Sequence, residues 1–374
     1  MVLFFVTEDW YFWSHRMELA SVLRQKGFNV TLGAHFTARE KDVQARGIQT
    51  YPVPFRRSMK HPVNDVLSCI AMVRAVFKFK PKVVHLVAIK PILLSFLCLA
   101  LFRDVKFVHA FAGLGYIFSA NTKQASGTRI VLKPILKWIL ARRNSFVLVQ
   151  NLDDKGMLME ELGAQESRVF VIPGSGIDVA KYFPKQDVEA RKAPTIMLIG
   201  RMLAEKGCRE FAAAAKVLRV AFPNSRFVLV GGTDNDNPGA ISESEIVSWV
   251  EAGYLEWWGR RDDIVNVLHQ ADVVCLPSYR EGLPKSLLEA ASCGIPLVAT
   301  DVPGCREVCI GQHTGLLVEP KDESTLIDAL SELIREPELR RKYGRNARRL
   351  VESKFSLEVI SAKTISFYDE IQKS

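Results

Sequence analysis

Short apolar runs rich in β-branched residues alternate with helix-like segments along the whole chain. Helical patterns lie between these runs, as at Glu18–Lys26 and Ile130–Arg143. Because parallel strands need helical crossovers, two series of such runs predict two parallel sheets, each covered by helices on both faces. We therefore expect an α/β fold with two Rossmann-like domains. The expected strands lie near residues 2–6, 29–33, 83–87, 105–109 and 146–150 in the first series, and near 195–200, 226–231, 255–258, 273–276, 297–299 and 315–318 in the second.

The length of 374 residues also favours two domains. The polar segment between Pro184 and Pro194 is the predicted linker. We expect residues 1–183 to form an N-terminal domain and residues 184–356 a C-terminal domain. The amphipathic stretch 357–374 is predicted to be a helix that packs back on the first domain. Ligands of parallel α/β sheets bind at the carboxyl ends of the strands, so we expect the site in a cleft between the domains.

The apolar segments do not predict a membrane span. The first run follows Met1 directly, without the basic stretch or cleavage signal of a secretory leader. The longest later run, Pro91–Phe102, has about a dozen residues where a bilayer needs roughly 20, so it predicts a buried helix.

The seven cysteines form no metal-like pairs, which favours free, mostly buried thiols in a reducing cytoplasm.

Positive charge is concentrated in the first half of the chain. Residues 1–175 contain 24 Lys and Arg against 12 Asp and Glu, a net +12, whereas residues 176–374 contain 26 against 29, a net −3. A basic half favours a polyanionic partner such as anionic lipid, pyrophosphate or nucleic acid. No nucleic-acid-binding motif is found, so we expect no nucleic acid partner.

Aromatic residues and cations interleave in three segments of this basic half. Such a mixture suits a bilayer interface, but ordinary surface charge beside partly buried rings is the alternative. A membrane interface is favoured by the charge asymmetry between the two halves. The segments are Trp10–Trp13, Phe55–Lys60 and Phe77–Lys80.

Two glutamates eight residues apart, Glu281 and Glu289, bracket a turn that contains Gly282 and Pro284 before a predicted helix. Proline suits the first helical position, because the N–H that it lacks would be unpaired there anyway. Unpaired N–H groups and the helix dipole form an anion site at such a start. The pattern predicts a phosphorylated sugar near Glu281, with Glu289 two turns into the helix and close to a ribose diol. Two solvated glutamates at an ordinary helix start are the alternative.

A second cluster of charge follows the strand that we expect at 195–199. Gly200 at the strand end lets the backbone approach a ligand closely. Arg201 and Lys206 then place two cations at the carboxyl edge of the sheet, where they can neutralise a departing diphosphate. The alternative is that both are surface cations of a loop between a strand and a helix.

In order and spacing, these motifs resemble those of the family 4 glycosyltransferases. The resemblance implies the GT-B fold, in which two Rossmann-like domains with parallel sheets face an interdomain cleft, and transfer with retention of anomeric configuration. It covers essentially the whole C-terminal domain. The matching motifs are Gly200-Arg201, Glu205-Lys206-Gly207, Gly259-Arg260, Glu281–Pro284 with Glu289-Ala290, Leu297–Asp301 and Gly315–Val318.

This resemblance implies a role for each matching residue. Arg201 and Lys206 would bind the donor diphosphate and Glu281 would contact the transferred sugar, which makes these three the expected catalytic residues. Glu289 would bind the nucleotide ribose. The remaining donor-binding positions are Gly200, the loop Arg260–Asp262 near the base, and Gly282, Leu283, Pro284 and Lys285 around the phosphate and sugar.

A finer resemblance is to bacterial enzymes of capsule, O-antigen and glycan assembly. Those enzymes extend undecaprenyl-diphosphate-linked sugars, often from UDP-N-acetylhexosamines. The resemblance rests on Phe111–Tyr116, Asn237-Pro238 and Val302–Glu307. It implies a nucleotide-sugar donor and a polyprenyl-diphosphate-linked acceptor as partners.

The N-terminal domain departs from the family pattern in two places. Many members have a glycine-rich loop after the first strand, where this chain has the aromatic segment Thr7–Arg16. Many also have a histidine just before the glycine that aligns with Gly113, where this chain has Ala112. The nearest histidine is His109, three residues earlier, for which a structural place on the strand is the alternative to a catalytic role; His15, beside Arg16 at a helix start, is the better candidate, with simple helix capping as its alternative. The candidate contacts to acceptor or phosphate are His15, Arg16, Gly113 and His109.

Asp234-Asn235-Asp236 resembles the Asp-x-Asp metal motif of other glycosyltransferases. It lies in a turn-rich segment that ends in Asn237-Pro238-Gly239. Since Arg201 and Lys206 already supply positive charge, we expect neither a metal nor another cofactor.

Together these features predict a cytoplasmic enzyme, peripheral on the inner face of the cell membrane. We expect a retaining glycosyltransferase that moves an N-acetylhexosamine from a UDP-sugar onto an undecaprenyl-diphosphate-linked saccharide. A GDP-sugar donor or a soluble acceptor is the nearest alternative. A retaining glycoside hydrolase that uses Glu281 and Glu289 as its carboxylate pair, and a non-catalytic basic scaffold on membrane or nucleic acid, are alternatives from other classes.

Overall fold

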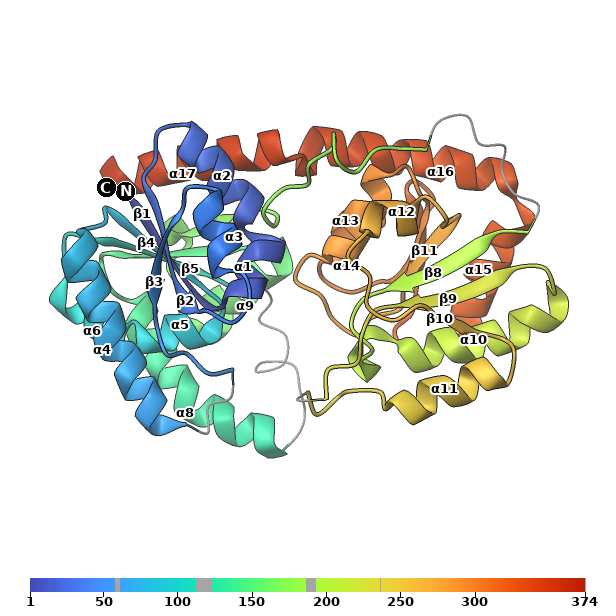
Figure 1. The fold of residues 1–374 in the computed structure, drawn as a ribbon, viewed down its shortest axis with the longest axis horizontal. Coiled ribbons are helices and arrows are strands. Elements are labelled where there is room, and N and C mark those ends of the chain that lie inside the picture. The colour runs from blue at the N-terminus through green and yellow to red at the C-terminus, as the bar shows by residue number, and fades with distance from the viewer. Residues whose placement is uncertain (58–60, 112–122, 186–192, 236, 374) are drawn as a thin grey trace. The chain divides into compact units, whose positions relative to one another are not determined.

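The computed structural model describes residues 1–57, 61–111, 123–185, 193–235 and 237–373. The chain divides into two compact units, which are Met1–Gly176 together with Leu357–Ser374, and Ile177–Ser356 (Figure 1). The first boundary lies before the expected position at 183/184, because Ile177 and Tyr182 are buried in a core of the second unit.

The first unit is built on a seven-stranded parallel sheet with the strand order β3-β2-β1-β4-β5-β6-β7. The interior strand β1 pairs with β2 on one side and with β4 on the other, so that Val2 lies opposite both Val30 and Val83. The strands are β1 (Val2–Glu8), β2 (Val30–His35), β3 (Gln49–Pro52), β4 (Val83–Val87), β5 (Lys106–Ala110), β6 (Ser145–Val149) and β7 (Val169–Val171).

Helices cover both faces of this sheet (Figure 1). Leu3 and Phe5 of β1 belong to the core under α4, α5, α6, α8 and α9, whereas Val2 and Phe4 belong to the core under α1, α2, α3 and α17. This alternation is the two-residue period of a strand that is buried on both faces. The helices are α1 (Asp9–His15), α2 (Met17–Gln25), α3 (Glu40–Ala45), α4 (Pro62–Phe79), α5 (Ile89–Leu94), α6 (Phe96–Leu101), α8 (Lys123–Leu140), α9 (Leu152–Leu162) and α17 (Leu357–Lys373).

The last helix of the chain, α17, is part of the first unit. It packs against α2, and Phe367 and Tyr368 are buried in the core beneath it. The Tyr368 hydroxyl lies 2.6 Å from Nδ1 of the buried His85 on β4. The C-terminal segment therefore completes a core that begins at the first strand.

The apolar run Pro91–Phe102, predicted as one buried helix, is instead two short helices, α5 and α6. The helix is interrupted at Ser95, whose hydroxyl donates a 2.6 Å hydrogen bond to the carbonyl of Ile92. This local bond competes with helix continuation. Helix α5 is buried, whereas α6 leaves Phe96, Leu97 and Leu101 exposed. Within the described part of the chain, every helix is too short or too polar to cross a bilayer.

The second unit is built on a six-stranded parallel sheet with the order β10-β9-β8-β11-β12-β13. Two parallel-sheet domains were predicted, and this prediction is confirmed. The strands are β8 (Thr195–Ile199), β9 (Arg226–Val230), β10 (Glu256–Trp257), β11 (Val273–Leu276), β12 (Leu297–Thr300) and β13 (Gly315–Val318). The helices are α10 (Cys208–Ala221), α11 (Glu243–Glu251), α12 (Ile264–Leu268), α13 (Lys285–Ser292), α14 (Cys305–Val308), α15 (Glu323–Arg335) and α16 (Pro337–Leu350), with a 3₁₀ turn η2 (Ala204–Lys206) and a π turn η3 (Val351–Phe355).

All seven cysteines are free and buried. Burial raises the pKa of the Cys69 thiol to about 11 and that of Cys98 to about 12. These thiols therefore behave as small apolar core residues rather than as nucleophiles.

Candidate active site

Two predicted catalytic residues meet at the carboxyl edge of the second sheet. Lys206 ends η2, which follows β8, and Glu281 lies in the loop between β11 and α13. The Lys206 Nζ atom lies 2.5 Å from Glu281 Oε1, and the two side chains are 21% and 11% exposed. The sequence placed each residue near the ligand but did not predict that they form an ion pair.

Ser278 is a site residue that the sequence reasoning missed. It is fully buried two residues after β11, and its hydroxyl donates a 2.7 Å hydrogen bond to Glu281 Oε1. Its own carbonyl accepts a hydrogen bond from the Thr300 hydroxyl at the end of β12. Glu281 is therefore held from two sides, by a cation and by a buried hydroxyl. A single serine three residues before a glutamate carries no distinctive sequence signal.

Gly304 allows the Glu281 loop to pack closely against the loop that follows β12. Its φ is +81°, and a Cβ there would lie 2.4 Å from the carbonyl oxygen of Gly282 and 2.7 Å from that of Glu281. Only glycine fits such a position without displacing the backbone. The Val302–Glu307 segment therefore shapes the site through its backbone.

Glu289 is buried on α13, with 7% of its surface exposed. Its Oε1 atom accepts a hydrogen bond from the Tyr182 hydroxyl at 2.7 Å and lies 3.2 Å from Nζ of Lys285. Helix α13 begins at Lys285, so Pro284 is not at the first helical position as predicted but precedes the helix with an extended backbone (ψ 113°). Glu289 consequently lies about one turn into the helix rather than two.

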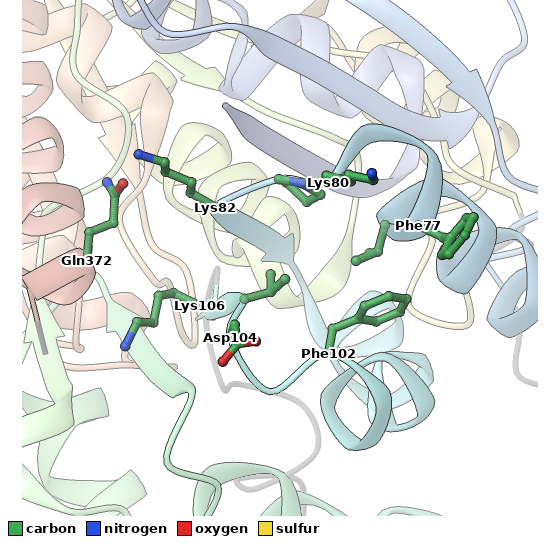
Figure 2. A pocket seen from close by; sticks show the side chains of 10 residues that line it. Phe77, Lys80, Lys82, Phe102, Asp104, Lys106 and Gln372 are labelled. Atoms are coloured by element: carbon green, nitrogen blue, oxygen red, sulfur yellow. The ribbon is translucent and has the colours of Figure 1, made fainter.

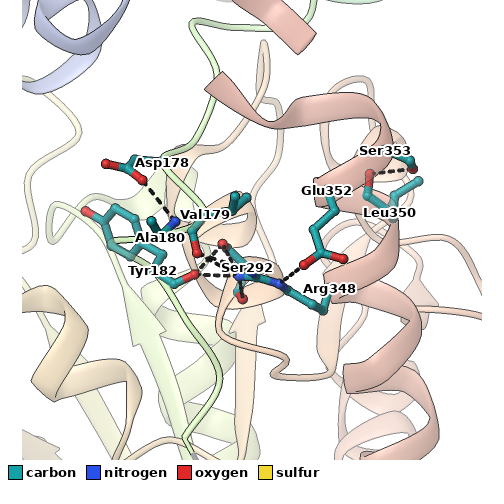
Figure 3. Close-up of polar contacts among 9 residues, drawn as sticks. All are labelled: Asp178, Val179, Ala180, Tyr182, Ser292, Arg348, Leu350, Glu352 and Ser353. Atoms are coloured by element: carbon teal, nitrogen blue, oxygen red, sulfur yellow. Dashed lines mark hydrogen bonds and ion pairs between the residues drawn. The ribbon is translucent and has the colours of Figure 1, made fainter. Parts of the chain in front are cut away.

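Arg348 fixes the segment that carries Tyr182 (Figure 3). From α16, its guanidinium donates hydrogen bonds to the carbonyls of Val179 at 3.2 Å and of Tyr182 and Ser292 at 2.7 Å. Its Nε atom bonds Glu352 at 2.6 Å. One arginine thus ties the start of the second unit to the end of α13, and so sets the position from which Tyr182 reaches Glu289.

Arg201, the third predicted catalytic residue, follows Gly200 directly after β8. Its guanidinium lies 2.5 Å from Asp234 Oδ2, and the side chains are 47% and 12% exposed respectively. Asp234 was expected not to be a metal ligand, and it is the counter-ion of this arginine. Asp236 lies outside the described residues.

The predicted loop near the base follows β10. Arg260 is 76% exposed, and its Nε atom lies 3.8 Å from Asp262, which is 82% exposed. At this distance and exposure the pair contributes little to stability. Both side chains can therefore reorient toward a ligand.

Two candidate residues of the first unit, His15 and Arg16, lie at the junction of α1 and α2. The His15 ring stacks on Tyr11 with 4.2 Å between centroids, and its Nδ1 atom lies 2.6 Å from the Ser14 hydroxyl. The next residue, Arg16, is only 3% exposed, and burial lowers the pKa of its guanidinium. The aromatic segment after β1 is a helix and not a phosphate-wrapping loop.

His109 lies on β5 and is fully buried. Its Nε2 atom lies 3.0 Å from the Ser145 hydroxyl, and burial lowers its pKa to about 3. The ring is therefore neutral at physiological pH and points into the core of the sheet. Gly113, the remaining candidate, lies outside the described residues.

Comparison with known proteins identifies the family. Residues 1–151 match the family described as glycosyl transferase 4-like, and residues 180–350 match the glycosyl transferases group 1. Of the curated relatives, the N,N'-diacetylbacillosaminyl-diphospho-undecaprenol alpha-1,3-N-acetylgalactosaminyltransferase of Campylobacter jejuni is 30% identical over 70% of each chain. The chain belongs to the GT-B glycosyltransferases.

Further relatives of this glycosyltransferase agree with that assignment. The UDP-Gal:alpha-D-GlcNAc-diphosphoundecaprenol alpha-1,3-galactosyltransferase of Escherichia coli is 28% identical over 72% of this chain and 70% of its own. Among solved structures, sucrose-phosphate synthase from Thermosynechococcus elongatus superimposes with a TM-score of 0.83, at 20% identity over 99% of this chain and 98% of that one. This structural likeness confirms the fold of two Rossmann-like domains.

The second unit of the glycosyltransferase thus gathers opposite charges at one sheet edge. Two cations, Arg201 and Lys206, and two carboxylates, Glu281 and Glu289, follow the carboxyl ends of β8 and β11. In this class of fold that edge is where ligands bind. Such an arrangement can bind a diphosphate through the cations and sugar hydroxyls through the carboxylates.

Proposed function

We propose that this glycosyltransferase moves a sugar from a UDP-sugar onto an undecaprenyl-diphosphate-linked saccharide in bacterial surface glycan assembly, with retention of configuration. An N-acetylhexosamine is the proposed sugar. The names of the relatives in Campylobacter jejuni and Escherichia coli support a lipid-diphosphate acceptor, and the second name includes a UDP-sugar. The observation that carries the proposal is the Lys206–Glu281 ion pair, which lies at the same carboxyl edge of the sheet that Arg201 follows.

In the proposed reaction, the bond between the sugar C1 atom and the diphosphate oxygen breaks, and the nucleotide diphosphate leaves with the electron pair. Arg201 and Lys206 stabilise the charge that develops on it. The acceptor hydroxyl attacks C1 from the same face, and its proton passes to the departing phosphate. Glu281 orients the sugar hydroxyls, and Glu289 holds the ribose of the donor.

We propose further that the first unit presents a membrane-bound acceptor. Its excess of positive charge supports this idea. The exposed Arg57 extends its guanidinium over the ring of Trp10, with 5.9 Å between them, which joins two of the segments expected at a bilayer interface. Lys60, in the same segment as Arg57, lies outside the described residues.

The deciding experiment is a transfer assay with a panel of UDP- and GDP-sugars and polyprenyl-diphosphate-linked acceptors, with products identified by mass. We expect one UDP-sugar to give a product one sugar heavier, with the anomeric configuration of the donor. Activity should survive EDTA, because the cations take the place of a metal. Transfer from a GDP-sugar alone would overturn the donor assignment, and loss in EDTA with rescue by Mg²⁺ would overturn the metal-free chemistry.

Two controls separate the other classes of function. A glycoside hydrolase would release sugar into water without any acceptor, so release in the absence of acceptor should be negligible. A non-catalytic scaffold would have no affinity for a nucleotide, so calorimetric titration with UDP should show saturable binding.

A further inference from the structure

A pocket lies in the first unit at the amino ends of β4 and β5, the edge opposite to the strand ends that bind ligands in this fold. Its volume is about 560 Å³, within the usual range for ligand sites. It is lined by the end of α4, the segment before β4, the segment between α6 and β5, and Gln372 of α17. None of the residues assigned to sugar transfer belongs to it.

Three lysines line this pocket against one carboxylate (Figure 2). Lys82 precedes β4 and Lys106 begins β5, and the N–H of Lys106 donates a 3.0 Å hydrogen bond to the carbonyl of Lys82. Figure 2 shows both side chains extending on the side of Gln372, with Lys80 on the other side beside Phe77. Among the described residues, no carboxylate lies within ion-pair distance of these three ammonium groups, Asp104 included. With three lysines against one aspartate, the lining carries an excess of positive charge, which favours an anion as the ligand.

Lys80 is held in a backbone conformation that favours glycine. It caps the end of α4 with φ +45° and ψ 53°, and its N–H donates to the carbonyl of Val76. Helices commonly end in a residue with this left-handed conformation. That residue is usually glycine, because glycine has no Cβ and adopts the conformation without strain. Strained backbone persists mainly where the side chain has a use. A lysine at this place supplies a third cation to the pocket.

Apolar side chains lie in the open beside these cations. Phe77 is 71% exposed, and Leu101 at the end of α6 is 63% exposed. The exposed apolar surface continues along α4, at helical spacing, through Ile70, Leu67, Val66 and Val63. An anion without an apolar part would make no contact with these apolar side chains. A phosphate attached to a hydrocarbon chain would contact both the lysines and the apolar side chains.

We propose that this pocket binds the phosphate of an amphiphile, with Lys80, Lys82 and Lys106 around the phosphate and Phe77 beside the apolar chain. Such a ligand could be a membrane phospholipid headgroup or a soluble phosphate monoester with an apolar chain. The inference does not depend on the proposed sugar transfer, because that reaction uses the second unit and the opposite edge of the first sheet.

The test measures binding of dihexanoylphosphatidic acid, below its micelle concentration, by calorimetry. The pocket variant is Lys82→Gln/Lys106→Gln. The matched control is Lys41→Gln/Lys363→Gln, which removes the same charge from two exposed lysines of the same unit outside the pocket. We expect saturable binding that is at least tenfold weaker in the pocket variant and within twofold of wild type in the control. Equal weakening in both variants would overturn the proposal, since net charge alone would then explain binding.

Two further measurements keep the result interpretable if the double variant folds poorly. Lys80→Gly relieves backbone strain, so we expect a higher melting temperature together with weaker phosphate binding; unchanged binding would remove Lys80 from the site. Inorganic phosphate should bind at least tenfold more weakly than dihexanoylphosphatidic acid, and equal affinity would overturn the assignment to an amphiphile.

A vesicle measurement separates the two sources of the phosphate. If the source is a membrane lipid, co-sedimentation with phosphatidylglycerol vesicles should fall in the pocket variant and not in the control. Unchanged sedimentation would exclude the membrane source. Binding of UDP to the second unit should be the same in all variants, which keeps failure here distinct from failure of the transferase proposal.

Discussion

Glu281 shares its Oε1 atom between two donors, the ammonium of Lys206 at 2.5 Å and the hydroxyl of Ser278 at 2.7 Å. We predict that Glu281→Gln lowers turnover by at least roughly 100-fold, the usual scale for a charged group positioned at a transition state. Because Gln keeps an oxygen that can accept hydrogen bonds from Lys206 and Ser278, the loss of the charge should cost only about 1–3 kcal/mol of folding stability. Turnover and melting temperature measured on the same preparation will check both halves of this prediction.

The matched control for this change is Glu245→Gln. Glu245 forms a 2.7 Å ion pair with Arg209 in the same unit, and the two side chains are 30% and 52% exposed. The substitution removes the same charge, and turnover should stay within twofold of wild type. If Glu281→Gln and Glu245→Gln have equal effects on turnover, Glu281 has no special part in the reaction.

Tyr182 is a second single residue whose role can be tested. Its hydroxyl and the ammonium of Lys285 both contact Glu289 and orient it. A hydrogen bond to a charged group contributes about 1.5–3 kcal/mol, and Lys285 still holds the carboxylate when this bond is lost. We therefore predict that Tyr182→Phe raises the KM for the donor about tenfold, at the lower end of that range, with kcat nearly unchanged. Tyr254→Phe, at a partly exposed tyrosine of the same unit, is the control. A fall in kcat with unchanged KM would contradict a role in donor binding.

At the scale of elements, Asp9 joins the start of α1 to the loop before α3. Its buried carboxylate accepts hydrogen bonds from the N–H groups of Thr37, Ala38 and Arg39, at 2.8–3.0 Å, and from the Thr37 hydroxyl. Burial acts to raise the pKa of this carboxyl, but the hydrogen bonds outweigh it and hold the pKa below its ordinary value of 3.8. Since the folded state favours the ionised form, Asp9 stabilises the fold above that value.

This stabilisation is lost as the pH falls below 3.8 through the lower pKa of the folded state. We predict that Asp9→Asn costs about 3 kcal/mol at neutral pH, because several hydrogen bonds to a charge are weakened together. The variant should also lose part of the decrease in stability toward acid pH. Urea unfolding between neutral and acid pH will measure both effects. Asp42→Asn, which removes an exposed partner of Arg39, should cost at most about 1 kcal/mol.

Some secondary-structure elements could be predicted from the sequence and others could not. The central strands were predicted because they are buried on both faces and so read as continuous apolar runs. Strand β3 was missed because Gln49–Pro52 lies at a sheet edge, is largely exposed and ends in proline. Strand β7 was missed because Val169–Val171 is only three residues long, at the other edge. No glycine or proline marks the break at Ser95.

The residues of the site divide in a similar way. Glu281 and Lys206 could be chosen as candidates from the sequence because each lies in a local motif with fixed spacing, and their catalytic roles stay predictions. Tyr182 could not, because it meets Glu289 from 107 residues away, and only the tertiary fold brings them together. Ser278 and Gly304 act through buried or backbone contacts, which leave no local pattern of charge or spacing.

At the scale of the whole molecule, the chain leaves its first unit at Gly176 and returns to it at Leu357. The returning helix α17 buries Ile360, Phe367, Tyr368 and Ile371 against the first sheet. Each large apolar side chain contributes about 1.5–3 kcal/mol when buried, so the four amount to roughly 6–12 kcal/mol. A whole domain is stable by only about 5–15 kcal/mol. The first unit is therefore not expected to stay folded without the last residues of the chain.

We predict that deletion of residues 357–374 unfolds the first unit and leaves the second able to bind UDP. Hydrogen exchange should show loss of protection in β1 and β4 but not in β8 and β11, and UDP affinity should stay within about threefold of wild type, or about 0.7 kcal/mol. Deletion of only Lys373 and Ser374 is the control, because it spares the buried side chains of α17. Retained protection throughout the first unit after the longer deletion would mean that the core between the sheet and α2 holds without α17. Loss of UDP binding would mean instead that the second unit depends on the first for its own folding.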